Sequence, residues 1–163
     1  MGLFSRKKSD EPEAEPQSSA PPQVELDEDG LPTTPTQPLR TLDEEQIAAD
    51  LQTLEAEGVD VDDLASISRG LHTAYQEWSQ ERTADHRQIV RRYAIGIGEH
   101  LDRHTDLDWC LVSDVFGTDL GLADGPRGDF MVVPGNLVAG RWMRGETSWI
   151  PDVVGHLIRR RER

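Results

Sequence analysis

The sequence predicts an α+β fold, in which N-terminal helices pack on a small three-stranded antiparallel meander with C-terminal helices. A disordered acidic tail is expected to precede this domain. Two patterns along the chain carry the prediction. Apolar residues recur every three to four positions from Leu64 to Leu101, which is the period of an amphipathic helix. After Asp106 the period falls to two, which is typical of strands with one buried face.

Charge and proline content divide the chain into a tail of residues 1–40 and a single domain of residues 41–163, with its core in 62–160. The net charge is −14, and residues 9–63 carry seventeen acidic side chains against one basic side chain. Seven of the ten prolines lie in the tail. Such a segment cannot bury enough apolar surface to offset the entropy of ordering it, so we expect it to be disordered. Its role would be that of a spacer, or of an acidic tether or docking segment.

Three helices are expected at the start of the domain. The first begins at Thr41, because Thr41 and Glu44 have the spacing of a capping box, and it ends at Gly58. The second covers about residues 62–78, and the third covers about residues 84–104. The polar break between them is short, so these two helices should be antiparallel neighbours.

The second half of the domain is expected to hold three short strands and two helices. Turn residues separate the strands, and the strand order should follow the chain as in a meander. Gly145 ends the first of these helices, and Pro151 lies in the first turn of the last one. The expected elements are strands at 109–113, 120–122 and 130–133, and helices at 137–142 and 149–158.

Two glycine-containing stretches could suggest phosphate cradles, but neither has a complete motif. The stretch Gly96–Glu99 lacks the preceding strand and the third glycine of a dinucleotide-binding fingerprint. The stretch Gly117–Gly121 lacks the Gly-Lys-Ser/Thr end of a P-loop. We therefore interpret them as turn and packing residues. Gly96 and Gly98 lie inside a helix, which indicates that another backbone approaches them closely.

Several short motifs follow one another along this half of the chain: Tyr93-x-x-Gly96-x-Gly98-Glu99, Trp109, Phe116-Gly117-Thr118-x-Leu120-x-Leu122, Val133-Pro134 and Val138-x-x-Arg141-x-x-x-Gly145-Glu146. With these motifs, roughly a third of the chain resembles an uncharacterised bacterial domain family of unknown function. The resemblance implies an α+β module of the bacterial cytoplasm and carries no activity over. The chain departs from the family pattern at Val133 and Gly135, where an Asn or Tyr is expected beside the proline that ends the strand.

Composition argues against several classes of partner. The acidic front of the chain would repel a polyanion, and the remainder is close to neutral, so we expect no nucleic-acid binding. No segment approaches the ~18 consecutive apolar residues of a membrane span, so no integral membrane association is expected. The single cysteine, Cys110, rules out an internal disulfide and fits a cytoplasmic location. It follows Trp109 in an apolar strand, where a cysteine is usually a small buried hydrophobe.

A histidine pair raises the alternative of a small metal-dependent hydrolase. His100 and His104 are four residues apart, so a helix presents both on one side, as in zinc hydrolases. Those enzymes have a glutamate directly after the first histidine, whereas Glu99 precedes it here. A third ligand would have to come from Asp102, Asp106 or Asp108. We therefore expect no catalytic residues, metal or cofactor, and keep the hydrolase as the alternative.

The aromatic pattern near the end of the chain favours binding. Trp142 and Trp149 flank a glycine turn close to Arg141, and Trp and Arg are enriched among interface anchors. We predict a partner-binding surface made by Arg141, Trp142 and Glu146, with Glu99 nearby. The competing interpretation is that both tryptophans are core residues that cap the sheet.

The predicted function is that of a non-catalytic module that binds an unknown protein partner, with the acidic tail as a tether. An acidic chaperone or immunity protein is a further alternative, besides the hydrolase that would use His100 and His104. The oligomeric state is left open by the sequence.

Overall fold

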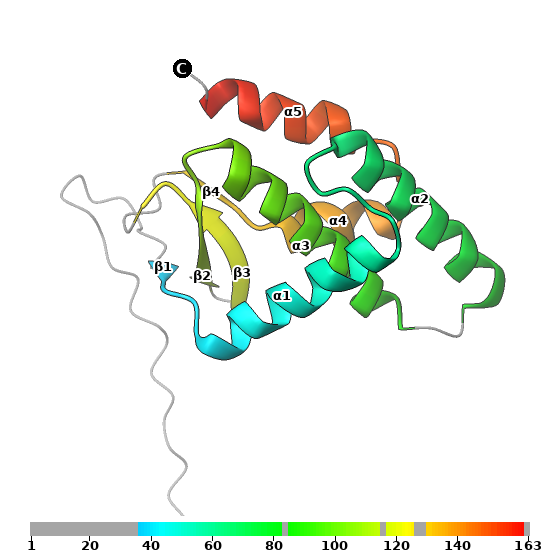
Figure 1. Cartoon of the computed structure of the whole chain (residues 1–163), viewed down its shortest axis with the longest axis horizontal. Helices are drawn as coiled ribbons and strands as arrows, with labels where there is room; N and C mark the ends of the chain where they lie inside the picture. Colours follow the sequence, from blue (N-terminus) through cyan, green and yellow to red (C-terminus); the bar gives the residue numbers. More distant parts are fainter. Residues whose placement is uncertain (1–35, 83–84, 115–116, 126–129, 162–163) are drawn as a thin grey trace, which may run out of the picture.

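Five helices and a four-stranded antiparallel sheet make up the part of the chain that the computed structural model describes, which is residues 36–82, 85–114, 117–125 and 130–161 (Figure 1). In chain order the elements are β1 (Thr36–Gln37), α1 (Thr41–Ala56), α2 (Leu64–Glu81), α3 (His86–His104), β2 (Asp108–Asp114), β3 (Gly117–Ala123), β4 (Met131–Val132), α4 (Pro134–Trp142) and α5 (Ile150–Arg161). The fold is therefore mixed helix and sheet, as predicted, and each predicted helix and strand has its counterpart.

The predicted three-stranded meander is wrong by one strand. The sheet has the order β1-β2-β3-β4, and β1 comes from residues assigned to the disordered tail. Thr36 pairs with Val112 and Gln37 pairs with Leu111 along the edge of β2. Two residues are too few to produce an alternating pattern, so this strand could not be predicted from the sequence. The rest of the predicted tail, residues 1–35, lies outside the described part of the chain.

α1 begins at Thr41 as predicted, but a different pair of residues caps it. The predicted capping box joined Thr41 to Glu44, but the residue that precedes the helix is Arg40. Its backbone N–H donates to Asp43 Oδ2 at 3.0 Å, and its guanidinium Nε lies 2.8 Å from the same oxygen. The acidic first turn therefore stabilises the N-terminus of the helix as expected, through a different pair of residues.

The other helix ends follow ordinary local chemistry. Asp63 precedes α2 and accepts from the Ala65 N–H at 2.9 Å, and Asp85 precedes α3 and accepts from the Arg87 N–H at 3.0 Å. α1 ends at Ala56, and Gly58 just after it has a φ of +75°, the left-handed conformation that favours glycine. α3 returns alongside α2 after the short break between them (Figure 1).

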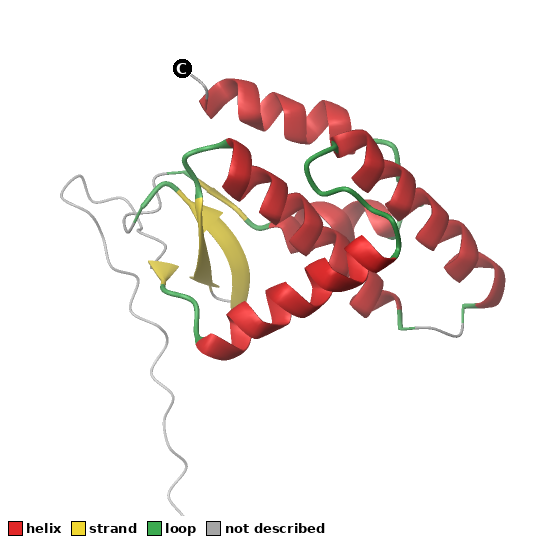
Figure 2. Cartoon of the chain, in the orientation of Figure 1, coloured by secondary structure: helices red, strands yellow, loops and turns green. Residues whose placement is uncertain are grey.

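α3 is the central helix of the domain. It contacts α1, α2, α4 and α5 and also reaches β2 and β3, and most of its second half is buried. The helices lie on one side of the sheet in Figure 2, and the main core forms between them and the strand face that carries Trp109 and Leu122. No described helix is both long enough and apolar enough to cross a bilayer.

Candidate functional site

A groove of about 540 Å³ opens between α3, α4 and the first half of β3. Its volume lies within the range of roughly 300–1,000 Å³ that is common for ligand sites, and most of its lining is apolar. The apolar lining includes Val90 and Ile95 from α3, Trp109 from β2, Leu120 from β3, and Val133 and Ala139 from the α4 region. Met143, which is 77% exposed, also lines it just after α4. This is the best-formed candidate site in the described part of the chain.

One wall of the groove is a strand with an incomplete neighbour. β3 pairs with β2 along its whole length, but it pairs with β4 only at Leu122 and Ala123. Thr118, Asp119 and Leu120 therefore have a described strand on the β2 side alone, and all three line the groove. A strand edge of this kind can pair with an added extended segment.

Basic side chains from the first turns of α3 lie at the groove. His86, Arg87 and Arg91 line it, and Asp119 is the acidic group in the lining. Arg91 is already paired, because its Nε lies 3.1 Å from Oδ2 of the buried Asp50 on α1. Arg87 is exposed and forms no ion pair with another described residue. The positive charge that this wall can offer to a ligand is therefore chiefly that of Arg87, which the helix N-terminus reinforces.

Trp142, one of the predicted partner-binding residues, belongs to the core. It is only 2% exposed, and its ring lies 5.0 Å from Tyr75 and 5.3 Å from Trp78 between centroids. It lines the groove without presenting a ring to the surface. The prediction that Trp142 forms a surface contact is therefore wrong, and the competing interpretation of a core residue is confirmed for it.

Of the other three predicted residues, Arg141 and Glu146 lie near each other where α4 leads into α5. Arg141 lies over the ring of Trp149, 4.4 Å from its centroid, and Glu146 pairs with Arg144 at 2.8 Å. The hydrogen bond from Arg144 is the main reason why the pKa of Glu146 is lowered, with a smaller contribution from Arg141. These residues share the α4–α5 connection.

Glu99 is engaged elsewhere on α3. Its carboxylate lies 2.8 Å from Arg103 Nε, and Arg103 Nη1 lies 2.9 Å from Asp62 Oδ2 in the connection between α1 and α2. No hydrogen bond or ion pair between described residues joins it to Arg141 or Glu146.

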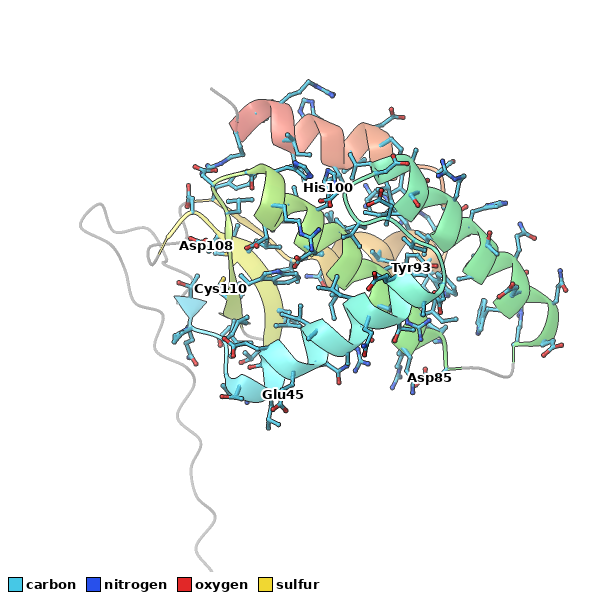
Figure 3. All side chains as sticks on the ribbon, in the orientation of Figure 1. Glu45, Asp85, Tyr93, His100, Asp108 and Cys110 are labelled. Carbon is cyan, nitrogen blue, oxygen red and sulfur yellow. The ribbon has the colours of Figure 1, made fainter. Side chains whose placement is uncertain are left out.

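The two histidines on α3, His100 and His104, contact the connection between α1 and α2, which is not the arrangement of a metal site. His100 is 5% exposed, and its Nδ1 lies 2.8 Å from the Val61 carbonyl oxygen. Its ring centroid is 4.4 Å from that of His104, whose Nε2 lies 3.4 Å from Asp62 Oδ1. Burial lowers the pKa of His100. Figure 3 labels His100 on α3.

The acids proposed as a third metal ligand have other partners or surroundings. Asp106 is held by Arg161, whose Nη2 lies 2.7 Å from its Oδ2. Burial is the main cause that raises the pKa of Asp102, and Asp108 is exposed at the start of β2. Within the described ranges, no group of three or more His, Cys, Asp or Glu side chains is arranged to hold a metal ion.

The groove could not be predicted from the sequence, because its lining comes from several separate elements of the chain. Comparison of the chain with protein-family models, with curated proteins and with solved structures finds no significant match.

Proposed function

We propose that the protein is a non-catalytic binding module that holds an extended, acidic segment of a partner protein in the groove between α3, α4 and β3. This keeps the class of function that the sequence suggests and moves the site away from Arg141 and Glu146. A setting in the bacterial cytoplasm, with the acid-rich N-terminal region as a tether, is part of the same proposal.

The observation that carries the proposal is that the apolar groove coincides with the incomplete edge of β3. An extended segment placed there could pair its backbone with Thr118–Leu120 while every second side chain enters the apolar lining. A small ligand would use the cavity but would leave the strand edge without a partner. The exposed Met143 on the rim also suits a protein partner, since methionine adapts to irregular apolar surfaces.

The charge at the groove supports an acidic segment. Arg87 is exposed near the N-terminus of α3 and is not matched by a described acid, whereas Arg91 is matched by Asp50. A carboxylate near Arg87 would interact with the guanidinium and with the positive end of the helix dipole. Because this contact is at the surface, it would set orientation more than affinity.

The test uses full-length protein and a phage-displayed library of unstructured peptides. We expect the selected peptides to alternate apolar and polar residues and to carry an acidic position. A synthetic copy of the strongest peptide should slow amide hydrogen exchange at the N–H groups of Thr118–Leu120 that point away from β2, because those groups would gain partners. Ala139→Glu, which places a charge in the apolar groove, should weaken this peptide at least about tenfold.

Asn136→Glu is the matched control. Asn136 lies on the same helix and is exposed, but it does not line the groove, so the same added charge should leave affinity within about twofold. Peptides that bind Ala139→Glu and wild type equally well would place binding elsewhere. Failure to select any peptide above background, with both proteins folded, would count against the function itself.

A further inference from the structure

A second groove, of about 960 Å³, lies along α1, between this helix and the connection that leads to α2. We call it the α1 groove. It is larger than the groove between α3, α4 and β3, and no described residue lines both. The apolar part of its lining is Ala48, Ala49 and Leu51 from α1 and Val59 and Val61 from the connection.

α1 is held on the domain by a different face from the one that lines this groove. Ile47, Asp50 and Leu54 are buried, and Oδ2 of Asp50 lies 3.1 Å from an arginine of α3. Ala48 and Ala49, which line the groove, are exposed. Because the buried side chains fix α1 in place, its exposed face is a firm wall that a second molecule can pack against.

The charged part of the lining is mainly acidic. Glu45, Glu55 and Asp60 line the groove and form no ion pair with another described residue. Arg103, the basic residue in the described lining, is matched by Asp62, whose Oδ2 lies 2.9 Å from its Nη1. Three negative charges thus remain without a matching cation beside an apolar lining, which is the complement of a basic and partly apolar ligand. Figure 3 labels Glu45 on α1.

The wall that α1 provides favours a helical ligand. The backbone of α1 is bonded within the helix, so unlike β3 it offers no edge to an extended segment. A helix can instead lay one apolar stripe against an apolar groove, with a contact every three to four residues. Positions 45 and 55 of α1 are about 15 Å apart along the helix axis, so a ligand needs about three helical turns to reach both acids.

We propose that the α1 groove binds a basic amphipathic helix of a partner protein. The apolar stripe of that helix packs on Ala48, Ala49 and Leu51, and its Lys or Arg side chains lie at the three unmatched acids. This ligand is opposite in charge to the acidic segment proposed for the groove between α3, α4 and β3, so the two sites select different partners. Each proposal stands or falls without the other.

The test uses the full-length protein and two fluorescently labelled synthetic peptides of about fifteen residues, close to the length of α1. One peptide combines Ala, Leu and Lys with its apolar residues in a single stripe, and the other has Glu in place of every Lys. Fluorescence anisotropy is measured at about 0.15 M salt, where exposed charges more than about 8 Å apart are largely screened. The basic peptide should bind with a Kd below about 100 µM and gain helical circular dichroism, and the acidic peptide should not bind.

Two pairs of variants locate the site. Ala49→Arg places bulk and positive charge in the groove and should weaken the basic peptide at least about tenfold. Ala56→Arg is its matched control, because Ala56 is exposed on α1 but does not line the groove, and affinity should stay within about twofold. Glu45→Lys and Glu44→Lys repeat the comparison for charge. A loss of about fivefold is expected for Glu45→Lys alone, since Glu44 is exposed outside the lining.

Equal losses within either pair would overturn the proposal, because the peptide would then be held by the general negative charge of the chain. Equal binding of the two peptides, or no binding of the basic one at about 1 mM, would overturn it as well. Far-ultraviolet circular dichroism checks that each variant is folded.

Two further results would overturn it in favour of another occupant. A dimer seen by analytical ultracentrifugation and lost in Ala49→Arg would assign the groove to a second copy of the chain. Replacement of the basic Arg6, Lys7 and Lys8 by Gln tests the chain's own N-terminus. If that change raised peptide affinity about tenfold and Ala49→Arg abolished the gain, the N-terminus would be the occupant.

Discussion

Contacts at single glycine positions decide how closely α3 approaches its neighbours. A Cβ atom on Gly98 would lie 2.1 Å from the Trp109 ring, and one on Gly96 would lie 2.9 Å from a methyl of Leu54. The sequence indicated close packing at both positions but attributed it to another backbone. The neighbours are instead a rigid indole ring and a flexible leucine, so the two glycines are not equally constrained.

At Gly98 we therefore expect a large cost of substitution. Gly98→Ala should lower the free energy of unfolding by about 3 kcal/mol, because the added methyl overlaps a ring that cannot move without disturbing the sheet. Denaturant unfolding followed by far-ultraviolet circular dichroism measures this. Gly140→Ala is the control: a Cβ there meets nothing within 4 Å in α4, so stability should rise by about 0.5–1 kcal/mol. A small cost at Gly98 would mean that the Trp109 ring is not fixed there.

At the scale of elements, the connection between α1 and α2 is fixed to α3 through His100. This histidine carries a backbone carbonyl partner, Val61, and it faces His104, Asp62 and Asp63. Burial is the main cause that lowers its pKa below the ordinary 6.5, and the contact with Val61 only partly offsets this. His100 and His104 thus hold the α1–α2 connection against α3. Their spacing in the sequence did not predict this role.

This arrangement predicts a loss of stability in mild acid. Above pH 6.5 His100 is neutral in both the folded and the unfolded chain, so it makes no pH-dependent contribution. As the pH falls below 6.5 the unfolded chain takes up the proton first, so stability declines until the lowered folded pKa is passed. His100→Asn keeps a donor for the Val61 carbonyl and removes the titration, so it should flatten this decline.

The measurement is the free energy of unfolding from urea titrations between about pH 7 and pH 5. His156→Asn, which replaces an exposed histidine on α5, should leave the slope unchanged. An identical slope in wild type and His100→Asn would show that His100 does not change its protonation on unfolding in this range.

At the scale of the whole molecule, the last residue of α5, Arg161, joins this helix to two distant parts of the domain. Arg161 Nη2 lies 2.7 Å from Asp106 Oδ2 and its Nη1 lies 3.0 Å from Asp124 Oδ2, so one guanidinium joins α5 to the α3–β2 connection and to the end of β3. It also lies over the ring of Phe130, 5.0 Å from the centroid. The two preceding arginines, Arg159 and Arg160, are exposed.

Removing this contact should destabilise the domain in a pH-dependent way. Arg161→Leu should lower the free energy of unfolding by about 1 kcal/mol at neutral pH, whereas Arg160→Leu should have little effect. The hydrogen bond from Arg161 lowers the pKa of Asp106; for Asp124 the larger cause is the Phe130 N–H, with Arg161 second. The carboxylates contribute stability above their unfolded pKa near 3.8, and that contribution is lost as the pH falls through their lower folded values.

The difference in unfolding free energy between wild type and Arg161→Leu should therefore shrink below about pH 3.8. Urea titrations at neutral pH and in acid measure both ends of this window. If the difference were the same at both, Arg161 would act by packing on Phe130 and not through its ion pairs.

The sequence by itself determined the helices and the main strands. Their apolar periods are strong over 64–101 and change clearly after Asp106, and the Asp and Gly residues at helix ends act through neighbours only a few residues away. Local patterns of this kind depend on backbone geometry alone, so they can be read without knowing the fold.

Only the tertiary structure decided the rest. The two-residue β1 exists because β2 offers an edge, Trp142 is buried because α2 and α4 meet there, and the groove exists because four distant elements enclose it. The prediction that Trp142 lies at a surface was wrong for the same reason: Trp142 is close in sequence to Arg141 and Glu146, but its burial depends on what packs against it. Contacts between distant segments leave no periodic pattern in either segment, so the sequence cannot specify them locally.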